Sequence, residues 1–221
     1  MSDNKELVHI ALDGPVAGGK GTVAHELAKR LGIPCLDTGA IYRGIAVYMK
    51  QYSDKENFDI FINNVTNAKI TAKIIDNVTH IYIDGKDVTG QLRENDISQL
   101  AAHTATFPTV RKLCTKISQD LAANHSLIAE GRDICSVVLP NAKFKFYLTA
   151  NIKVRARRRY EEILKKRQDI SFAQVLRETK QRDKSDMTKG GLVKTKDAVV
   201  IDSTKLTVDE ITGLMLKYIL R

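Results

Sequence analysis

Residues 14–22 read GPVAGGKGT and lie between an apolar run, residues 7–13 (LVHIALD), and a segment with helical spacing, residues 20–31. This is the GxxxxGK frame of a phosphate-binding loop in its required context, after a strand and before a helix. The glycines let successive backbone N–H groups turn toward phosphate oxygens, and the helix N-terminus adds partial positive charge. Lys20 can reach the β- and γ-phosphates. We therefore predict a site for the phosphates of ATP or GTP, formed by Gly14, Pro15, Val16, Ala17, Gly18, Gly19, Lys20, Gly21 and Thr22.

One position of this loop departs from the general motif, in which Ser or Thr follows the lysine. Gly21 stands there, and Thr22 comes one residue later. We predict that the Thr22 hydroxyl lies near Mg²⁺, either as a direct ligand or through water. Asp13, just before the loop, is a second candidate near the metal.

Strands and helices alternate along the chain outward from this loop. Short apolar runs predict strands, and apolar residues at helical spacing predict the helices between them. Five parallel strands are expected, at residues 7–13, 33–36, 126–130, 143–149 and 198–202. The predicted fold is therefore α/β, a doubly wound five-stranded parallel sheet with helices on both faces. In such sheets ligands bind at the carboxyl ends of the strands.

The pattern changes between residues 66 and 100. Residues 68–75 (AKITAKII) and 80–83 (HIYI) alternate apolar and polar positions, which is typical of half-exposed strands. Asp84-Gly85 is a strong hairpin signal. We predict a small antiparallel insertion at 66–100 within a single domain, residues 1–221.

Composition weighs against several classes of protein. The formal net charge is +9, yet aromatic residues make up only 6% with no Trp, which argues against nucleic acid as the main ligand. No apolar run approaches the ~18 residues that span a bilayer. The three cysteines form no CxxC spacing, so a reducing cytoplasm is expected.

Further motifs follow the GKGT of the loop in order along the chain. They are LDTGAIYR (36–43), FPTVR (107–111), AEGRD (129–133), QRDKSD (181–186) and VIDST (200–204). From about residue 7 to about residue 218, the chain closely resembles the bacterial cytidylate kinases. The resemblance implies a cytoplasmic, monomeric enzyme of pyrimidine nucleotide metabolism that transfers the γ-phosphoryl group of ATP to CMP or dCMP. It also implies that the insertion is a CMP-binding subdomain and that residues 150–190 form a helical lid.

The two nucleotides bring several negative charges together, so fixed cations must offset their repulsion. The resemblance places such cations around the transferred and acceptor phosphates at Arg43, Arg132, Arg182 and Lys189. It also places the Thr38 hydroxyl on the acceptor phosphate. The family usually carries Arg at the position of Lys189, so a bidentate clamp becomes a point charge there.

The resemblance also assigns recognition of the base and the sugar. Arg111 would donate to the cytosine ring, Asp133 would accept from its exocyclic amine, and Asp186 would accept from the sugar hydroxyls. Each assignment has a plainer alternative: a solvated helix residue for Arg111, a turn contact with Arg132 for Asp133, and a surface acid for Asp186. Where the family has a Ser near the base, this chain reads AHT, residues 102–104.

A run of arginines occupies the helix predicted at 152–167. Arg155, Arg158 and Arg159 share one face of it. In the family an Arg of the lid stabilises the moving phosphoryl group, and we assign that role to Arg158, with Lys20 and Arg132 as the other catalytic residues. The alternative is a solvated basic face.

Three rival functions remain at this point. A kinase for UMP, shikimate or another small acceptor would share the loop. A nucleic-acid-binding P-loop ATPase would account for the positive charge. A nucleotide-sensing structural protein would bind ATP without turnover.

Overall fold

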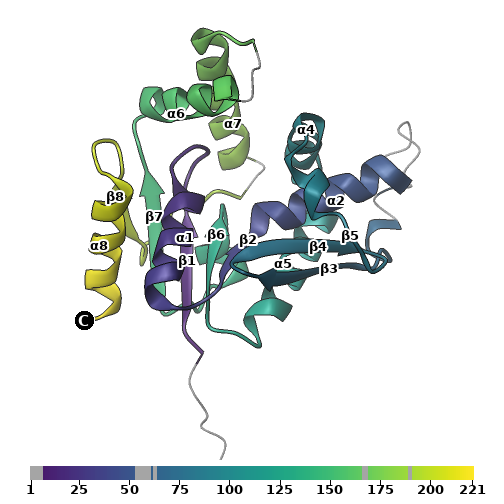
Figure 1. Cartoon of the computed structure of the whole chain (residues 1–221), viewed down its shortest axis with the longest axis horizontal. Coiled ribbons are helices and arrows are strands. Elements are labelled where there is room, and N and C mark those ends of the chain that lie inside the picture. Colours follow the sequence, from purple (N-terminus) through teal and green to yellow (C-terminus); the bar gives the residue numbers. More distant parts are fainter. Residues whose placement is uncertain (1–6, 53–60, 62–63, 166–168, 189–190) are drawn as a thin grey trace, which may run out of the picture. The chain divides into compact units, whose positions relative to one another are not determined.

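A computed structural model of the protein describes residues 7–52, 61, 64–165, 169–188 and 191–221. Its main sheet has five strands in the order β2-β6-β1-β7-β8 (Figure 1). These strands are β1 (His9–Asp13), β2 (Cys35–Asp37), β6 (Leu127–Gly131), β7 (Phe144–Thr149) and β8 (Val199–Asp202). β1 pairs in parallel with β7, and β7 pairs in parallel with β8. The predicted α/β fold with a five-stranded parallel sheet is thereby confirmed.

The continuous apolar character of β1 has a clear structural reason. Ile10, Ala11 and Leu12 are all fully buried, because a strand within a parallel sheet is covered on both faces. The chain divides into two compact units: a first unit of residues 1–9 and 32–129, and a second unit of residues 10–31 and 130–221.

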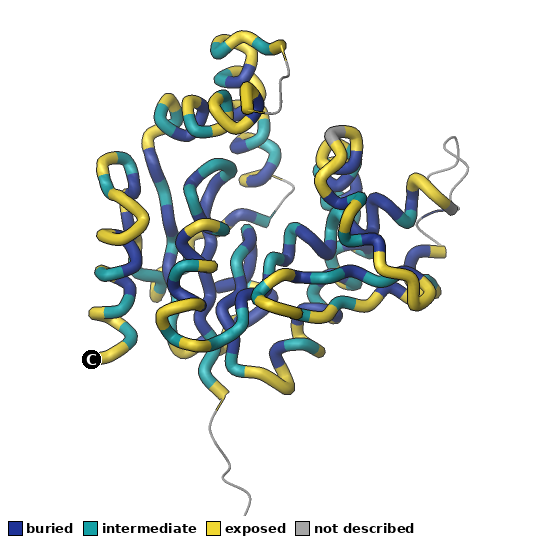
Figure 2. Tube along the Cα trace, viewed as in Figure 1, coloured by how far each residue is buried: buried dark blue, intermediate teal, exposed yellow. Residues whose placement is uncertain are grey.

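The second unit carries the phosphate loop and four long helices. They are α1 (Lys20–Leu31), α6 (Ile152–Lys165), α7 (Phe172–Thr188) and α8 (Val208–Ile219). α1 packs against α8 and α6 packs against α7, in both cases through a buried face (Figure 2). α8 begins with the predicted capping box, in which the Thr207 hydroxyl accepts from the backbone N–H of Glu210 and the Glu210 carboxylate accepts from that of Thr207.

The first unit contains the second sheet, which is antiparallel as predicted. It consists of β3 (Ile70–Ile75), β4 (Val78–Ile83) and β5 (Lys86–Asp87). Positive φ angles at Asp84 (49°) and Gly85 (81°) confirm the predicted hairpin turn. Asp76 (50°) and Asn77 (60°) form a second such turn, which the sequence analysis did not single out.

Helices of the first unit surround this small sheet. They are α2 (Thr38–Tyr52), the 3₁₀ turn η1 (Thr89–Arg93), α4 (Asn95–Thr104) and α5 (Pro108–Ala122). α2 packs against β4 so closely that a Cβ added at Gly44 would lie 2.4 Å from Cγ2 of Ile81. The bounds 66–100 for the inserted subdomain and 150–190 for the lid remain predictions.

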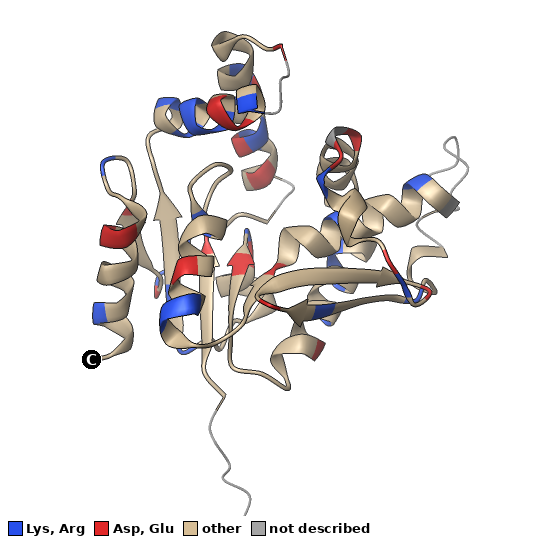
Figure 3. Cartoon of the chain, in the orientation of Figure 1, with Lys and Arg blue, Asp and Glu red and all other residues tan. Residues whose placement is uncertain are grey.

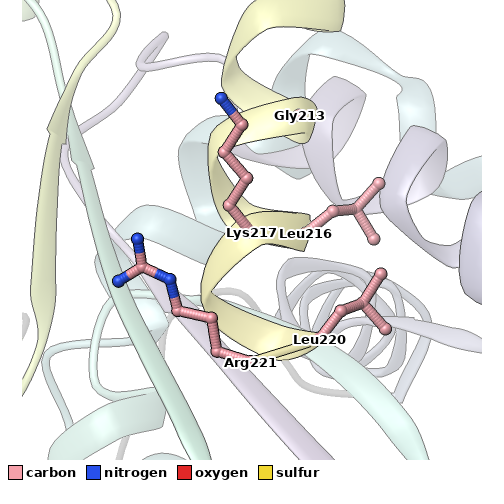
Figure 4. A pocket seen from close by; sticks show the side chains of 5 residues that line it. All are labelled: Gly213, Leu216, Lys217, Leu220 and Arg221. Carbon is pink, nitrogen blue, oxygen red and sulfur yellow. The ribbon is translucent and has the colours of Figure 1, made fainter.

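None of the helices in the described part of the chain is long and apolar enough to cross a membrane. A shallow pocket lies at the end of α8, lined by Gly213, Leu216, Lys217, Leu220 and Arg221 (Figure 4). It contains none of the side chains that the sequence predicts to be functional.

Candidate active site

The phosphate loop of the second unit joins β1 to α1 through an unusual backbone path. Gly14 is irreplaceable there, because an added Cβ would lie 2.0 Å from the carbonyl oxygen of Leu148. Ala17 has φ of 54° and Gly19 has φ of 88°, conformations that turn the backbone sharply. These two positive φ angles give the loop the inward curl that concave anion sites use.

Lys20, the loop's lysine, is only 5% exposed. Its ammonium donates to the carbonyl oxygen of Pro15 at 2.9 Å. Burial, and then the positive charge of Arg132, lower the pKa of Lys20 to about 7, although the carboxylates of Glu130, Asp13 and Asp186 oppose this shift. An incoming polyphosphate would favour the charged form of this lysine.

Three of the residues predicted to bind the substrate form a second cationic cluster in the same unit. Asp186, 3% exposed, accepts from Nε of Arg132 at 2.7 Å and from Nε of Arg182 at 2.9 Å. Asp186 is therefore a buried residue rather than a surface acid. It holds two guanidinium groups together near Lys20, whose pKa responds to both Arg132 and Asp186.

The arginines of α6, blue in Figure 3, divide between two environments. Arg158 donates to the hydroxyl of Ser203 at 3.2 Å and to its carbonyl oxygen at 2.8 Å. Its Nη1 also lies 3.9 Å from where a Cβ would stand on Gly19. Arg159 points outward to an exposed ion pair with Glu162. The solvated alternative therefore holds for Arg159 but not for Arg158.

Arg155 is a residue whose task the sequence analysis missed. It is 5% exposed and forms a bidentate ion pair with Asp183, with distances of 2.9 and 2.6 Å. It also donates to the carbonyl oxygen of Val16 in the phosphate loop at 3.1 Å. The only signal in the sequence was its position three residues before Arg158.

Asp13 is fully buried, and each of its carboxylate oxygens accepts a backbone N–H. The donors are Ile134 at 2.9 Å and Cys135 at 2.8 Å. Burial raises the pKa of Asp13. These bonds fasten the short π-helical turn η2 (Ile134–Val138), which begins directly after Asp133, itself 4% exposed. Asp13 thus has a structural task beside the loop.

A carboxylate that was not among the predicted metal ligands lies near the start of α1. Oε1 of Glu130, at the end of β6, is 3.5 Å from where a Cβ would stand on Gly21. Thr22 is exposed at the same helix start. Among the described residues there is no group of three His, Cys, Asp or Glu side chains that could hold a metal ion.

The predicted acceptor residues of the first unit lie near the start of α2 and on α5. Thr38 is 4% exposed, and Arg43 donates to Oδ2 of Asp37 at 2.6 Å. The backbone N–H of Asp37 donates to the Thr79 hydroxyl of β4 at 3.0 Å, which ties this site to the small sheet. Arg111 is half-buried on α5, rather than fully solvated.

The residues that depart from the family pattern are 102–104 and Lys189, and residues 102–104 differ in their surroundings. Thr104 is fully buried and its hydroxyl donates to the carbonyl oxygen of Ala101 at 3.2 Å, whereas His103 is exposed and packs edge-on against Phe107. Ala102, which precedes both residues, is half-buried. Lys189 lies outside the described residues.

Known proteins resemble this chain over nearly its whole length. A family model described as cytidylate kinase matches residues 10–221. A cytidylate kinase of Caldicellulosiruptor saccharolyticus is 39% identical over 213 residues, covering 95% of this chain and 94% of the relative. One from Fervidobacterium nodosum is 38% identical and covers 94% of each chain. A solved structure of an uncharacterized protein from Eubacterium ventriosum has a TM-score of 0.50 at 16% identity, covering 97% of this chain and 98% of its own, and is similar in fold alone.

Proposed function

The chain belongs to the cytidylate kinase family, and we propose from this that its phosphate loop binds ATP and its arginine cluster binds the acceptor phosphate. The enzyme transfers the γ-phosphoryl group of ATP to CMP or dCMP, giving ADP and CDP or dCDP. The observation that carries the assignment of residues is the second cationic cluster. A protein that only bound ATP would not need Arg132 and Arg182 held beside Lys20 by a buried carboxylate.

Catalysis in this proposal is positioning and electrostatics. The acceptor phosphate is ionised near neutral pH, since its second pKa is about 6, so no general base is required. Lys20 and the loop N–H groups hold the donor phosphates, and Arg132 and Arg182 offset the repulsion between the two anions. Arg158, docked on Ser203 next to the loop, adds positive charge where the phosphoryl group moves.

Asp186 has two tasks in this scheme. Without substrate it holds the two arginines in place, and with substrate it accepts from the sugar hydroxyls. Thr38 and Arg43 are the proposed ligands of the acceptor phosphate in the first unit, and Asp37 holds Arg43 there. Lys189 remains a prediction.

For the base, Arg111 donates to the cytosine ring and Asp133 accepts from the exocyclic amine. Uracil carries a carbonyl in place of that amine, so a carboxylate would face another acceptor. This pair of residues therefore accounts for a preference for CMP and dCMP over UMP.

Mg²⁺ bound together with ATP would supply positive charge that offsets the charge of the phosphates. The exposed hydroxyl of Thr22 and the carboxylate of Glu130 are oxygen donors that suit this ion, directly or through water. Asp13 was also predicted near the metal. Its two bonds to backbone N–H groups make it the weaker of the two carboxylates for this role.

One assay tests both the reaction and the choice of base. ADP release is measured with ATP plus CMP, dCMP or UMP, for the native protein, Lys20→Ala and Asp133→Ala. We expect turnover with CMP and dCMP, its loss in Lys20→Ala, and a smaller CMP-to-UMP ratio of kcat/KM in Asp133→Ala. An unchanged ratio would remove Asp133 from base recognition.

The remaining predictions concern partners and location. We propose a monomer from the family resemblance, a cytoplasmic location from the cysteine spacing, and no nucleic-acid partner from the low aromatic content. ATP hydrolysis that polynucleotides stimulate in a salt-sensitive way would instead support the rival ATPase. Size-exclusion chromatography with light scattering tests the monomer.

A further inference from the structure

Arg155 of α6 is a buried, charged side chain that contacts a carbonyl oxygen of the phosphate loop. Its Nη1 donates to the carbonyl oxygen of Val16 at 3.1 Å. Its Nε donates to the carbonyl oxygen of Ala150 at 3.0 Å, and Nη1 and Nη2 donate to the carboxylate of Asp183 of α7 at 2.9 and 2.6 Å. Arg155 and Asp183 are 5% and 9% exposed, so the geometry of this pair is well defined.

The contact with Val16 constrains the next residue of the loop. In a trans peptide the C=O of one residue and the N–H of the next point in opposite directions. A Val16 carbonyl held toward Arg155 therefore directs the N–H of Ala17 to the other side. Ala17 has φ of 54°, a left-handed conformation that is unfavourable for a residue with a Cβ and persists only where its surroundings enforce it.

We propose that Arg155 is a positioning residue for ATP: held by Asp183, it sets the peptide between Val16 and Ala17 so that the loop keeps its phosphate-binding shape. The inference rests on the proposed role of the loop in binding ATP. Arg155 acts through the loop backbone and does not itself contact the nucleotide.

Lysine cannot replace Arg155 in this task. A guanidinium reaches Asp183 with two parallel bonds and still presents a further N–H in its plane to Val16, whereas an ammonium is a compact point charge. Arg158, three residues further along α6, contacts Ser203, whose hydroxyl donates to the carbonyl oxygen of Gly18. α6 therefore contacts the loop directly at Val16 and is linked to Gly18 through Ser203.

The test compares Arg155→Lys, Asp183→Asn and a matched control, Arg30→Lys. Arg30 lies on α1 and makes exposed ion pairs with Glu26 and Asp209, so its substitution removes the same fork away from the loop. Calorimetry with a non-hydrolysable ATP analogue and Mg²⁺ gives the Kd, and steady-state kinetics give the KM values for ATP and for CMP. Circular dichroism melts report folding of each variant.

We expect the Kd and KM for ATP to rise about tenfold or more in Arg155→Lys and Asp183→Asn. The KM for CMP should stay within about twofold, and Arg30→Lys should match the native protein. An unchanged Kd for ATP, or equal changes in the KM values for both substrates, would overturn the proposal. If Arg155→Lys does not fold, the Kd of the Asp183→Asn variant for ATP tests the proposal in its place. If the native protein does not bind ATP, the proposed function itself fails.

Discussion

Lys20 should take up a proton when ATP binds above neutral pH. Burial holds the pKa of this lysine at about 7 in the free protein. The triphosphate of ATP would surround the ammonium with negative charge and raise its pKa well above 7. Because only the protonated form fits the complex, affinity for ATP should fall as pH rises through and beyond 7.

The size of the effect follows from that pKa. At pH 7 about half of the free protein carries a protonated Lys20, and at pH 9 only about 1% does. The Kd for ATP should therefore rise by about 50-fold over this range, or about 2.3 kcal/mol. At pH 8, binding should take up about 0.9 proton for each ATP bound.

Isothermal titration calorimetry provides the measurement. The Mg²⁺ complex of a non-hydrolysable ATP analogue is titrated at pH 8 in two buffers of different ionisation enthalpy, and the difference in heat gives the number of protons. Lys20→Met is the control, because it lacks the titrating group and should bind weakly without proton uptake. Equal binding heats for the native protein in both buffers would show that Lys20 is already charged, and would refute the reasoning.

Three further predictions concern separate parts of the chain. Gly44→Ala should lower the free energy of unfolding by about 1–3 kcal/mol, because the new Cβ would lie 2.4 Å from Cγ2 of Ile81; denaturant unfolding measures this, and the loss should be smaller in an Ile81→Ala background, which lacks that Cγ2. Thr207→Ala should cost about 1 kcal/mol of stability by removing the cap of α8, with kcat unchanged. Asp186→Asn should lower kcat/KM for CMP by about tenfold or more, because two arginines lose the anion that positions them.

Each of these has an outcome that contradicts it. A native unfolding midpoint for Gly44→Ala would mean that α2 and β4 can separate at no cost. Loss of activity in a folded Thr207→Ala would place α8 in the catalytic machinery. An Asp186→Asn variant with native kinetics would show that Arg132 and Arg182 keep their positions without the carboxylate.

Much of the fold could be predicted because its signals are local. A strand, a glycine-rich loop and a helix follow one another within residues 7–31, and backbone geometry alone ties that order to phosphate binding. The capping box of α8 and the turn at Asp84 and Gly85 likewise depend on residues a few positions apart. The turn at Asp76 and Asn77 was missed because neither of its two residues is a glycine.

The candidate site was predictable as a set of residue types but not as a set of contacts. Arg132 and Asp186 are 54 positions apart, and Asp13 and Ile134 are 121 apart. Nothing in their own neighbourhoods indicates that Asp186 would be buried between two arginines, or that Asp13 would fasten a distant turn. Contacts of this kind arise only when the strands and helices are packed.

The sequence by itself therefore determined the phosphate loop, the alternation of strands and helices, and the cations available for a second anion, because these depend on periodicity and residue chemistry. Only the tertiary structure decided which partner each arginine of α6 contacts. Arg155 and Arg158 turn toward the loop, and Arg159 turns to solvent, although all three share one helical face in the sequence. The physical reason is that an arginine binds only a group that lies within its reach. Which groups lie there is decided by the packing of the helices and strands.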